Sequence, residues 1–188
     1  MGKMKLKFNP NLKYQDDAVK SVTGLFEGQR VLFSNFTING QATLDSTQGV
    51  ANKRDISKND ILQNLRKIQK FHKLGLSSIL RDLDFNIEME TGTGKTYVYL
   101  KTIFELNKLY GFTKFIIVVP SIAIKEGVFK SIEITKDHFK GLYDNVIYDY
   151  FVYDSSKLEQ VRNFAVNSTI QIMIINIDAF NKGFKDKT

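Results

Sequence analysis

The chain has 188 residues, of which 43% are hydrophobic and 25% charged, and it carries a net charge of +7. This apolar content, which includes 15 Phe and 8 Tyr, excludes a disordered chain and predicts a globular protein with a substantial core. No cysteine occurs, which excludes disulfides and thiolate metal sites and is compatible with a reducing cytoplasm. The longest apolar runs, FIIVVP and IMIINI, fall far short of the ~20 residues that a membrane span requires, so we expect a soluble protein. The net positive charge favours a polyanionic partner such as nucleic acid, although many basic proteins bind no nucleic acid.

The first part of the chain predicts a helix followed by a strand. The helix is expected from about Tyr14 to Phe26, because apolar residues recur there at helical spacing until the stop signal Gly28. RVLFSNFTI, at residues 30–38, is typical of a strand. The polar, glycine-containing stretch at 39–55 predicts an exposed loop or a mobile insertion.

A second helix is expected to begin at a capping box formed by Ser57 and Asp60. One side of this helix is apolar and the other is basic. A basic helix face is more often solvated than bound to phosphate, and the solvated interpretation is favoured here for Arg66, Lys67, Lys70 and Lys73.

From residue 85 onward, predicted strands alternate with predicted helices. Strands are expected at FNIEM, FIIVVP, VIYDYFVYD and IQIMIINI, which occupy residues 85–89, 115–120, 146–154 and 170–177. Helices are expected at 95–110, at 122–132, as a separate short helix at 136–142, and from a Ser156–Glu159 capping box to about Asn167. FIIVVP contains no charge, which predicts a strand buried on both faces. The alternation predicts an α/β fold with a mainly parallel sheet flanked by helices.

The junction METGTGKT, at residues 89–96, has the composition and the context of a phosphate-binding loop. Two glycines let backbone N–H groups converge on phosphate oxygens, and the following helix directs its positive dipole end at the same anion. Lys95 is expected to reach the β- and γ-phosphates of ATP, and the Thr96 hydroxyl to ligate Mg²⁺, so these two are the candidate catalytic residues. The candidate nucleotide contacts in the loop are Thr91, Gly92, Thr93, Gly94, Lys95 and Thr96.

The general loop pattern has a glycine where this chain has Met89, and TGTGKT without that glycine resembles superfamily 2 helicases and translocases. Far upstream, LKYQDDAV at residues 12–19 resembles the glutamine motif of such motors. The resemblance implies that the Gln15 amide recognises the adenine edge and that Tyr14 stacks on or supports the base. The alternative for Gln15 is an ordinary surface residue in a first helical turn.

Two further segments resemble parts of these motors that contact the nucleic-acid backbone. VVPSIAIKEGVFKS, at residues 118–131, resembles motif Ia, and the segment at 174–182 resembles motif Ib or Ic. Pro120 and Ser121 lie where a predicted strand ends and a predicted helix begins, and a helix N-terminus is a natural phosphate site. The nucleic-acid contacts that these resemblances imply are Pro120, Ser121, Lys125, Asn176 and Phe180.

VPSIAIKEG and NIDAFNK are most similar to the Res subunit of bacterial type III restriction–modification enzymes, and the resemblance covers nearly the whole chain. It implies a single N-terminal RecA-like P-loop NTPase domain over residues 1–188, with residues 28–60 as an insertion. It also implies ATP and Mg²⁺ as cofactors, double-stranded DNA and a modification subunit as partners, and the bacterial cytoplasm as location. In the full enzyme, ATP hydrolysis is expected to drive translocation or switching on DNA, coupled to DNA cleavage.

Several catalytic elements of such an enzyme are missing from the sequence. No Asp-Glu dipeptide is available for a Walker B pair, and neither proline precedes an Asp, as a PD…ExK nuclease site needs. We therefore expect an N-terminal fragment that is inactive alone. Another superfamily 2 helicase and a catalytically inactive nucleic-acid-binding module remain alternatives, while Met89 counts against a nucleotide kinase. His72 and His138 have no partner at metal spacing, and Glu90 is expected to have a structural role at the lip of the loop.

Overall fold

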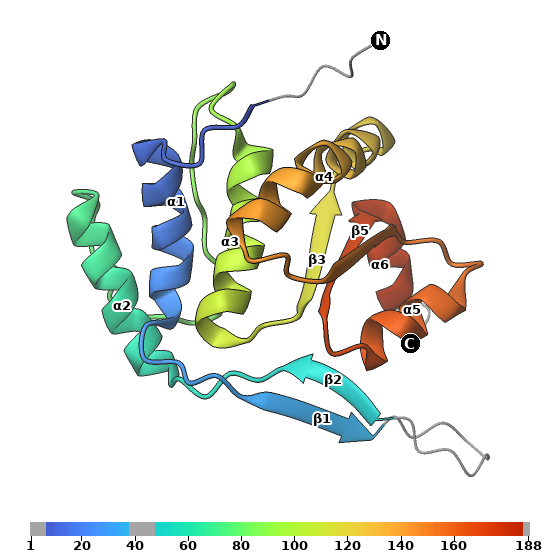
Figure 1. Ribbon diagram of the computed structural model, residues 1–188. Coiled ribbons are helices and arrows are strands. Elements are labelled where there is room, and N and C mark those ends of the chain that lie inside the picture. Colours follow the sequence, from blue (N-terminus) through green and yellow to red (C-terminus); the bar gives the residue numbers. More distant parts are fainter. Residues whose placement is uncertain (1–6, 38–47, 186–188) are drawn as a thin grey trace. The chain divides into compact units, whose positions relative to one another are not determined.

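The computed structural model describes residues 7–37 and 48–185, and the chain divides into two compact units (Figure 1). The first unit comprises the residues up to Leu32 together with Arg54–Gly111, and the second comprises Phe33–Lys53 together with the residues from Phe112 onward. That the two units form the one domain predicted over residues 1–188 stays a prediction. None of the helices in the described ranges has both the length and the apolar character needed to cross a lipid bilayer.

In its described residues, the first unit contains three α-helices. They are α1 at Lys13–Thr23, which continues into a short 3-10 turn at Gly24–Phe26, α2 at Lys58–Phe71 and α3 at Lys95–Tyr110. Gly28 has φ +95°, a backbone conformation that favours glycine, and it ends the first helical stretch as predicted. Ser57 caps α2 by accepting a hydrogen bond from the Asp60 N–H at 3.1 Å, which confirms Ser57 as the predicted start signal, while the Asp60 carboxylate accepts from the Ser57 hydroxyl at 2.6 Å.

Helix α1 packs against α3, and this contact forms the apolar centre of the first unit. Ala18, Val19 and Val98 are buried together, and Met89 packs against them. At the other end of the helix pair, the Tyr110 hydroxyl donates to the Thr23 carbonyl oxygen at 2.8 Å. The two helices are therefore joined along their length, which places the start of α1 beside the start of α3.

Helix α2 uses part of its basic face for contacts within the unit. Arg66 donates to the backbone carbonyl oxygens of Ser77 and Ser78 at 2.8 and 2.9 Å. Lys67 forms an exposed ion pair with Glu27 at 3.2 Å. These contacts agree with the interpretation of this face as an ordinary protein surface.

Residues 85–89 do not form the predicted strand, and the segment 72–94 contains neither helix nor strand. A strand needs neighbouring backbone groups to complete its hydrogen bonds, and no described strand pairs with FNIEM. Its residues still pack in part, since Met89 turns toward the core between α1 and α3. The prediction was wrong because alternating side chains favour a strand but do not supply its partner.

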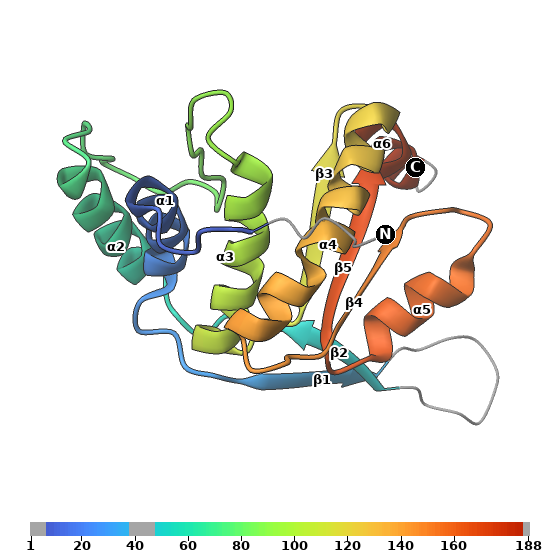
Figure 2. The ribbon, with the colours of Figure 1, turned by 45° about the horizontal axis from the view of Figure 1, so that its top comes forward.

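The second unit contains a parallel sheet in the order β3-β5-β4, and these strands lie side by side in Figure 2. This confirms the predicted mainly parallel sheet. Ile170, Ile172 and Ile174 of β5 are fully buried at its centre. The elements of the sheet and its helices are β3 at Lys114–Val119, α4 at Ile122–Leu142, β4 at Tyr148–Val152, α5 at Leu158–Val166, β5 at Ile170–Asn176 and α6 at Ile177–Lys185.

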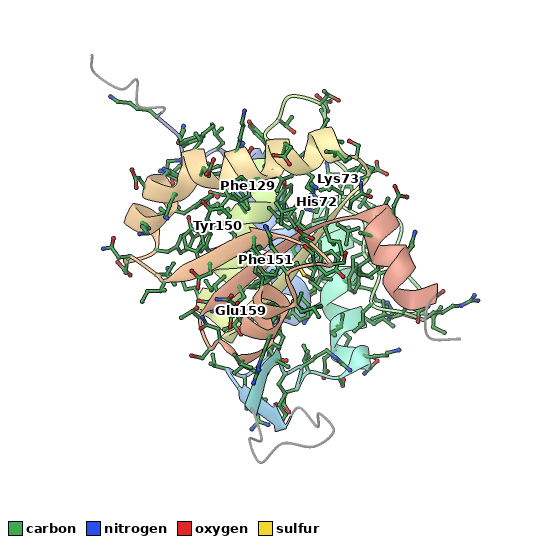
Figure 3. The ribbon with its side chains drawn as sticks, turned by 90° about the vertical axis from the view of Figure 1, so that its right-hand side faces the viewer. His72, Lys73, Phe129, Tyr150, Phe151 and Glu159 are labelled. Carbon is green, nitrogen blue, oxygen red and sulfur yellow. The ribbon has the colours of Figure 1, made fainter. Side chains whose placement is uncertain are left out.

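Helices α4 and α5 cover opposite faces of this sheet. Phe129 of α4 packs on Tyr150 of β4, with ring centroids 5.3 Å apart, and Phe164 of α5 packs on the next residue, Phe151, at 6.1 Å. Neighbouring residues of a strand point to opposite faces. Figure 3 shows Phe129 and Tyr150 on the α4 side, whereas Phe151 lies toward Glu159 in α5.

A two-stranded antiparallel ribbon, β1 at Phe33–Thr37 and β2 at Gln48–Asn52, completes the second unit. The first strand confirms the prediction, but β2 falls in the stretch that was expected to be a loop. Pairing with β1 overrides the weak strand propensity of QGVAN. Asn52 attaches the ribbon to β3, because its side chain bonds the Thr113 N–H and both backbone groups of Lys114. Residues 38–47 lie outside the described residues; they include the last residue of the predicted strand and the first part of the predicted loop.

Two helix predictions need correction. The stretch expected to be two helices is one continuous α4, since no residue between 132 and 136 breaks a helix. Helix α5 does not begin at a capping box, because the Ser156 hydroxyl donates to the Asp154 carboxylate at 2.7 Å and Lys157 occupies the N-cap position without a side-chain cap. A local turn bond of Ser to Asp competes with capping.

Strand β3 is not buried on both faces as predicted. Ile116 and Val118 are 47% and 41% exposed, whereas Val119 is buried. Ile116 and Phe151 are both register partners of Met173, so Ile116 and Val118 point to the face of the sheet that α5 covers. Helix α5 packs there against β5 and β2. The side chains of β3 on that face therefore remain open, although the strand carries no charge between Phe115 and Val119.

Candidate functional site

The loop between Glu90 and Lys95 has the backbone geometry that its glycines predict. Gly92 and Gly94 have φ +81° and +83°, in the left-handed region where other residues are strained. Helix α3 starts at Lys95, directly after the second of these glycines. The chain therefore turns sharply into the helix and leaves the first backbone N–H groups of α3 at the loop.

The donor set of this loop suits an anion. The N–H groups of Lys95, Thr96 and Tyr97 precede the first intrahelical bond of α3, which runs from the Val98 N–H to the Gly94 carbonyl oxygen at 3.0 Å. The N-cap residue Gly94 has no side chain that could cap this end, and the first turn contains no acidic residue. Uncapped N–H groups and the positive end of the helix dipole both favour phosphate.

The Lys95 ammonium lies on the loop itself. Its Nζ donates to the Glu90 carbonyl oxygen at 2.8 Å, and the Thr93 hydroxyl donates to the same oxygen at 2.7 Å. The structural role predicted for Glu90 thus belongs to its backbone carbonyl, and its side chain is exposed. A lysine held by a carbonyl oxygen can exchange that acceptor for a charged phosphate oxygen, which binds an ammonium more strongly.

Thr96 is half-buried in the first turn of α3, one residue after Lys95. Tyr99, one turn further along, places its hydroxyl in a buried position. Burial raises the pKa of this hydroxyl, and the neighbouring Thr96 side chain partly opposes that rise. The Tyr99 hydroxyl therefore stays protonated near neutral pH, and no negative charge is placed beside Thr96.

Helix α1 brings Gln15 to the loop, 78 positions away in the sequence. The Gln15 side chain is buried, and its Nε2 donates to the Thr93 carbonyl oxygen at 2.9 Å. The fit is close, because a Cβ added to Gly94 would lie 2.7 Å from that nitrogen. Gln15 is therefore not the surface residue of the alternative interpretation, although its contact with adenine stays a prediction. Tyr14 is 49% exposed and available to a ligand.

The residues predicted to contact nucleic acid gather at one end of the sheet in the second unit. Val119 and Asn176 are register partners at the carboxyl ends of β3 and β5, so Pro120 and Ser121 follow at the same edge. Ser121 caps α4 by accepting from the Ile124 N–H at 3.3 Å, and Asn176 Oδ1 accepts from the Asp178 N–H at 2.7 Å. Lys125 and Phe180 are half-buried on α4 and α6. Contact with nucleic acid stays a prediction.

A separate hollow of about 350 Å³ lies in the second unit, between β4, β5 and α5. Asp149, Gln160, Asn163 and Gln171 are among the residues that line it, and none of the predicted site residues does. The described part of the chain contains no group of acidic, histidine or cysteine side chains that would hold a metal ion by themselves. His72 contacts the Ser21 hydroxyl at 2.9 Å, as an ordinary polar residue.

Comparison with known proteins assigns the chain to a family. Residues 11–188 match the family described as "Type III restriction enzyme, res subunit". The chain belongs to this family. It is 38% identical over 104 residues to the EcoPI Res subunit from Escherichia phage P1, and 40% identical over 102 residues to the EcoP15I Res subunit from Escherichia coli. Each match covers 52% of this chain and 10% of the relative, so the chain spans about a tenth of the length of these Res subunits.

One feature of this Res-family chain was not found from the sequence. The Lys101 ammonium is buried and forms an ion pair with Asp16 at 2.5 Å. The two residues are 85 positions apart, so no local spacing connects them. An apolar helix face interrupted by one lysine is the only sequence signal, and it does not identify the partner.

Proposed function

We propose that this Res-family chain binds ATP with Mg²⁺ at the loop of Gly92–Thr96, as the nucleotide-binding part of the motor of a type III restriction enzyme. One observation carries the proposal. Two left-handed glycines place the uncapped start of α3 and Lys95 at one short loop, and helix α1 brings the buried Gln15 amide to the same loop. In this proposal the N–H groups and Lys95 bind the phosphates, and the Gln15 amide binds the base of the same nucleotide.

Each residue of the loop has a distinct task in this proposal. The first N–H groups of α3 donate to phosphate oxygens, and Lys95 moves from the Glu90 carbonyl oxygen to the β- and γ-phosphates. The Thr96 hydroxyl supplies one oxygen ligand for Mg²⁺, which neutralises phosphate charge when bound. Gln15 keeps one amide N–H on the Thr93 carbonyl oxygen and presents its second N–H and its own carbonyl oxygen to the adenine edge, with Tyr14 beside it.

The remaining site residues are proposed to contact duplex DNA. Pro120, Ser121 and Asn176 share one edge of the sheet, and Lys125 adds a positive charge on α4. Phe180 lies on α6, which follows the same edge. In the full enzyme, ATP-driven translocation or switching on DNA is coupled to cleavage, with a modification subunit as partner and the bacterial cytoplasm as location. The similarity to Res subunits of restriction-modification enzymes supports this setting.

A titration with fluorescent ATP in the presence of Mg²⁺ tests the proposal. Lys95→Ala should abolish binding, because it removes the charge that neutralises the β- and γ-phosphates, while the circular dichroism spectrum stays unchanged. Lys108→Ala is the matched control, since Lys108 is an exposed lysine in the last turn of the same helix. Equal affinity of the Lys95→Ala variant and the unaltered chain would show that the nucleotide does not bind at this loop.

A further inference from the structure

Lys101 is a buried lysine in the middle of α3, with 8% of its surface exposed. Lysines are almost never buried this far unless the ammonium is paired. Its Nζ donates to Asp16 Oδ1 at 2.5 Å and to the Pro10 carbonyl oxygen at 2.7 Å. One ammonium on α3 thus holds two points of the chain, one before α1 and one within its first turn.

The start of α1 depends on this ammonium because its own capping is weak. The N-cap residue Leu12 supplies no side-chain cap, and its carbonyl oxygen accepts from the N–H groups of Gln15 and Asp16, both at 3.0 Å. The buried apolar contact of Ala18 and Val19 with α3 lies further along the helix. The bonds from Lys101 therefore join the first turn of α1 to α3, between this apolar contact and the stacking of Phe8 on Tyr97 at 6.0 Å.

Gln15 lies inside the segment that Lys101 holds. It directly precedes Asp16, and its amide reaches the Thr93 carbonyl oxygen of the loop at 2.9 Å. A shift of the first helical turn would move this amide away from the loop, while Lys95 and the N–H groups of α3 would stay in place because they belong to α3 itself.

We propose that Lys101, through Asp16 and Pro10, is a positioning residue that holds the Gln15 amide at the phosphate loop and so sets the selectivity for adenine. This inference rests on the proposed nucleotide site and adds a residue to it. Lys101 touches neither the loop nor the base, and it acts through the first turn of α1. Loss of the Lys101 charge should therefore weaken the recognition of the base and leave the recognition of the phosphates unchanged.

The experiment compares Lys101→Met with Lys67→Met in the 188-residue chain. Methionine keeps the apolar stem of lysine and removes the charge in both variants. Lys67 pairs with Glu27 on the surface of the same unit, with 65% of its side chain exposed, so this control breaks an ion pair away from α1. Calorimetry then measures the affinities of each variant for ATP and GTP with Mg²⁺.

Lys101→Met should lower the affinity for ATP about tenfold, toward that for GTP, and leave GTP binding within about twofold, since a good amide–base contact is of this size. Lys67→Met should change neither affinity. A parallel loss for both nucleotides, or no loss, would overturn the inference, because a merely structural lysine gives one of those two results.

A second measurement needs no nucleotide, so it separates this inference from the proposed function. In the ¹⁵N-labelled chain, the side-chain amide signals of Gln15 are assigned by their loss in Gln15→Ala. Lys101→Met should shift or broaden them, and Lys67→Met should not; unchanged signals would overturn the inference even if ATP binds. If the unaltered chain binds no nucleotide, the proposed function fails while this test still stands. If Lys101→Met does not fold, Asp16→Asn replaces it, since that variant keeps the bond from Lys101 to Pro10.

Discussion

Replacement of Gly94 by alanine tests the contact between Gln15 and the loop through its energy. Gly94 has φ +83°, and an L-residue forced into this left-handed region costs about 1–2 kcal/mol. The new Cβ would also lie 2.7 Å from Gln15 Nε2, so the amide must leave the Thr93 carbonyl oxygen. A lost hydrogen bond of this kind costs about 0.5–1.5 kcal/mol. The free energy of unfolding should therefore fall by about 1.5–3.5 kcal/mol.

Gly92→Ala separates the two costs. Gly92 has φ +81°, and a Cβ there meets nothing within 4 Å among the described residues. Its replacement should cost the backbone strain alone, about 1–2 kcal/mol. The excess cost at Gly94, about 0.5–1.5 kcal/mol, is then the contribution of the Gln15 bond, and it should disappear when both alanines are compared in a Gln15→Ala background.

Urea unfolding followed by circular dichroism measures these differences, provided that the variants unfold with equal m-values. Both glycines belong to the same compact unit, so both report on the same transition. Equal costs for the two alanines in the unaltered chain would refute the predicted clash between the new Cβ and Gln15. An excess at Gly94 that persists in the Gln15→Ala background would refute it as well, because the clash would then not involve Gln15.

Gln15→Ala should narrow the preference for ATP over GTP in a competition titration, because a good bidentate base contact contributes about 1–3 kcal/mol of discrimination. Equal competition by the two nucleotides in the unaltered chain would count against the glutamine motif. The 188-residue chain should release phosphate from ATP negligibly, with or without duplex DNA, because it has no Asp-Glu pair to place Mg²⁺ and the attacking water. Turnover near that of a full-length Res subunit would contradict this and direct mutation to Glu88, Glu90 and Asp178. Duplex DNA binding, followed by fluorescence anisotropy, should be weak and fall steeply between about 50 and 200 mM salt; affinity independent of salt would argue against phosphate contacts.

The helices that were predicted best carry their own boundary signals. Ser57 begins α2 and Gly111, at φ +71°, ends α3, so local chemistry decides both positions. Ser156 shows the limit of such signals, because Asp154 competes for its hydroxyl and the helix starts later. Strands depend on partners far along the chain. Residues 85–89 alternate like a strand without forming one, and β2 forms because β1 pairs with it.

The same distinction applies to the candidate site. The loop could be predicted because its glycines, Lys95 and Thr96 are consecutive and their chemistry is local. Gln15 could be predicted only from resemblance, since nothing in the first turn of α1 indicates a buried amide. The partner of Lys101 could not be predicted, because packing of α1 on α3 decides which carboxylate reaches the ammonium.

The position of the bound nucleotide can be determined in solution by NMR spectroscopy. Backbone amide signals of the ¹⁵N-labelled chain are followed while ATP with Mg²⁺ is added, with Lys95→Ala as the control. If ATP binds at this loop, the largest shifts will fall on the N–H groups of Gly92, Gly94, Lys95 and Thr96 and on the Gln15 side chain, and they will vanish in Lys95→Ala. Shifts confined to other residues, or equal shifts in the variant, would contradict the claim that this loop is the ATP site.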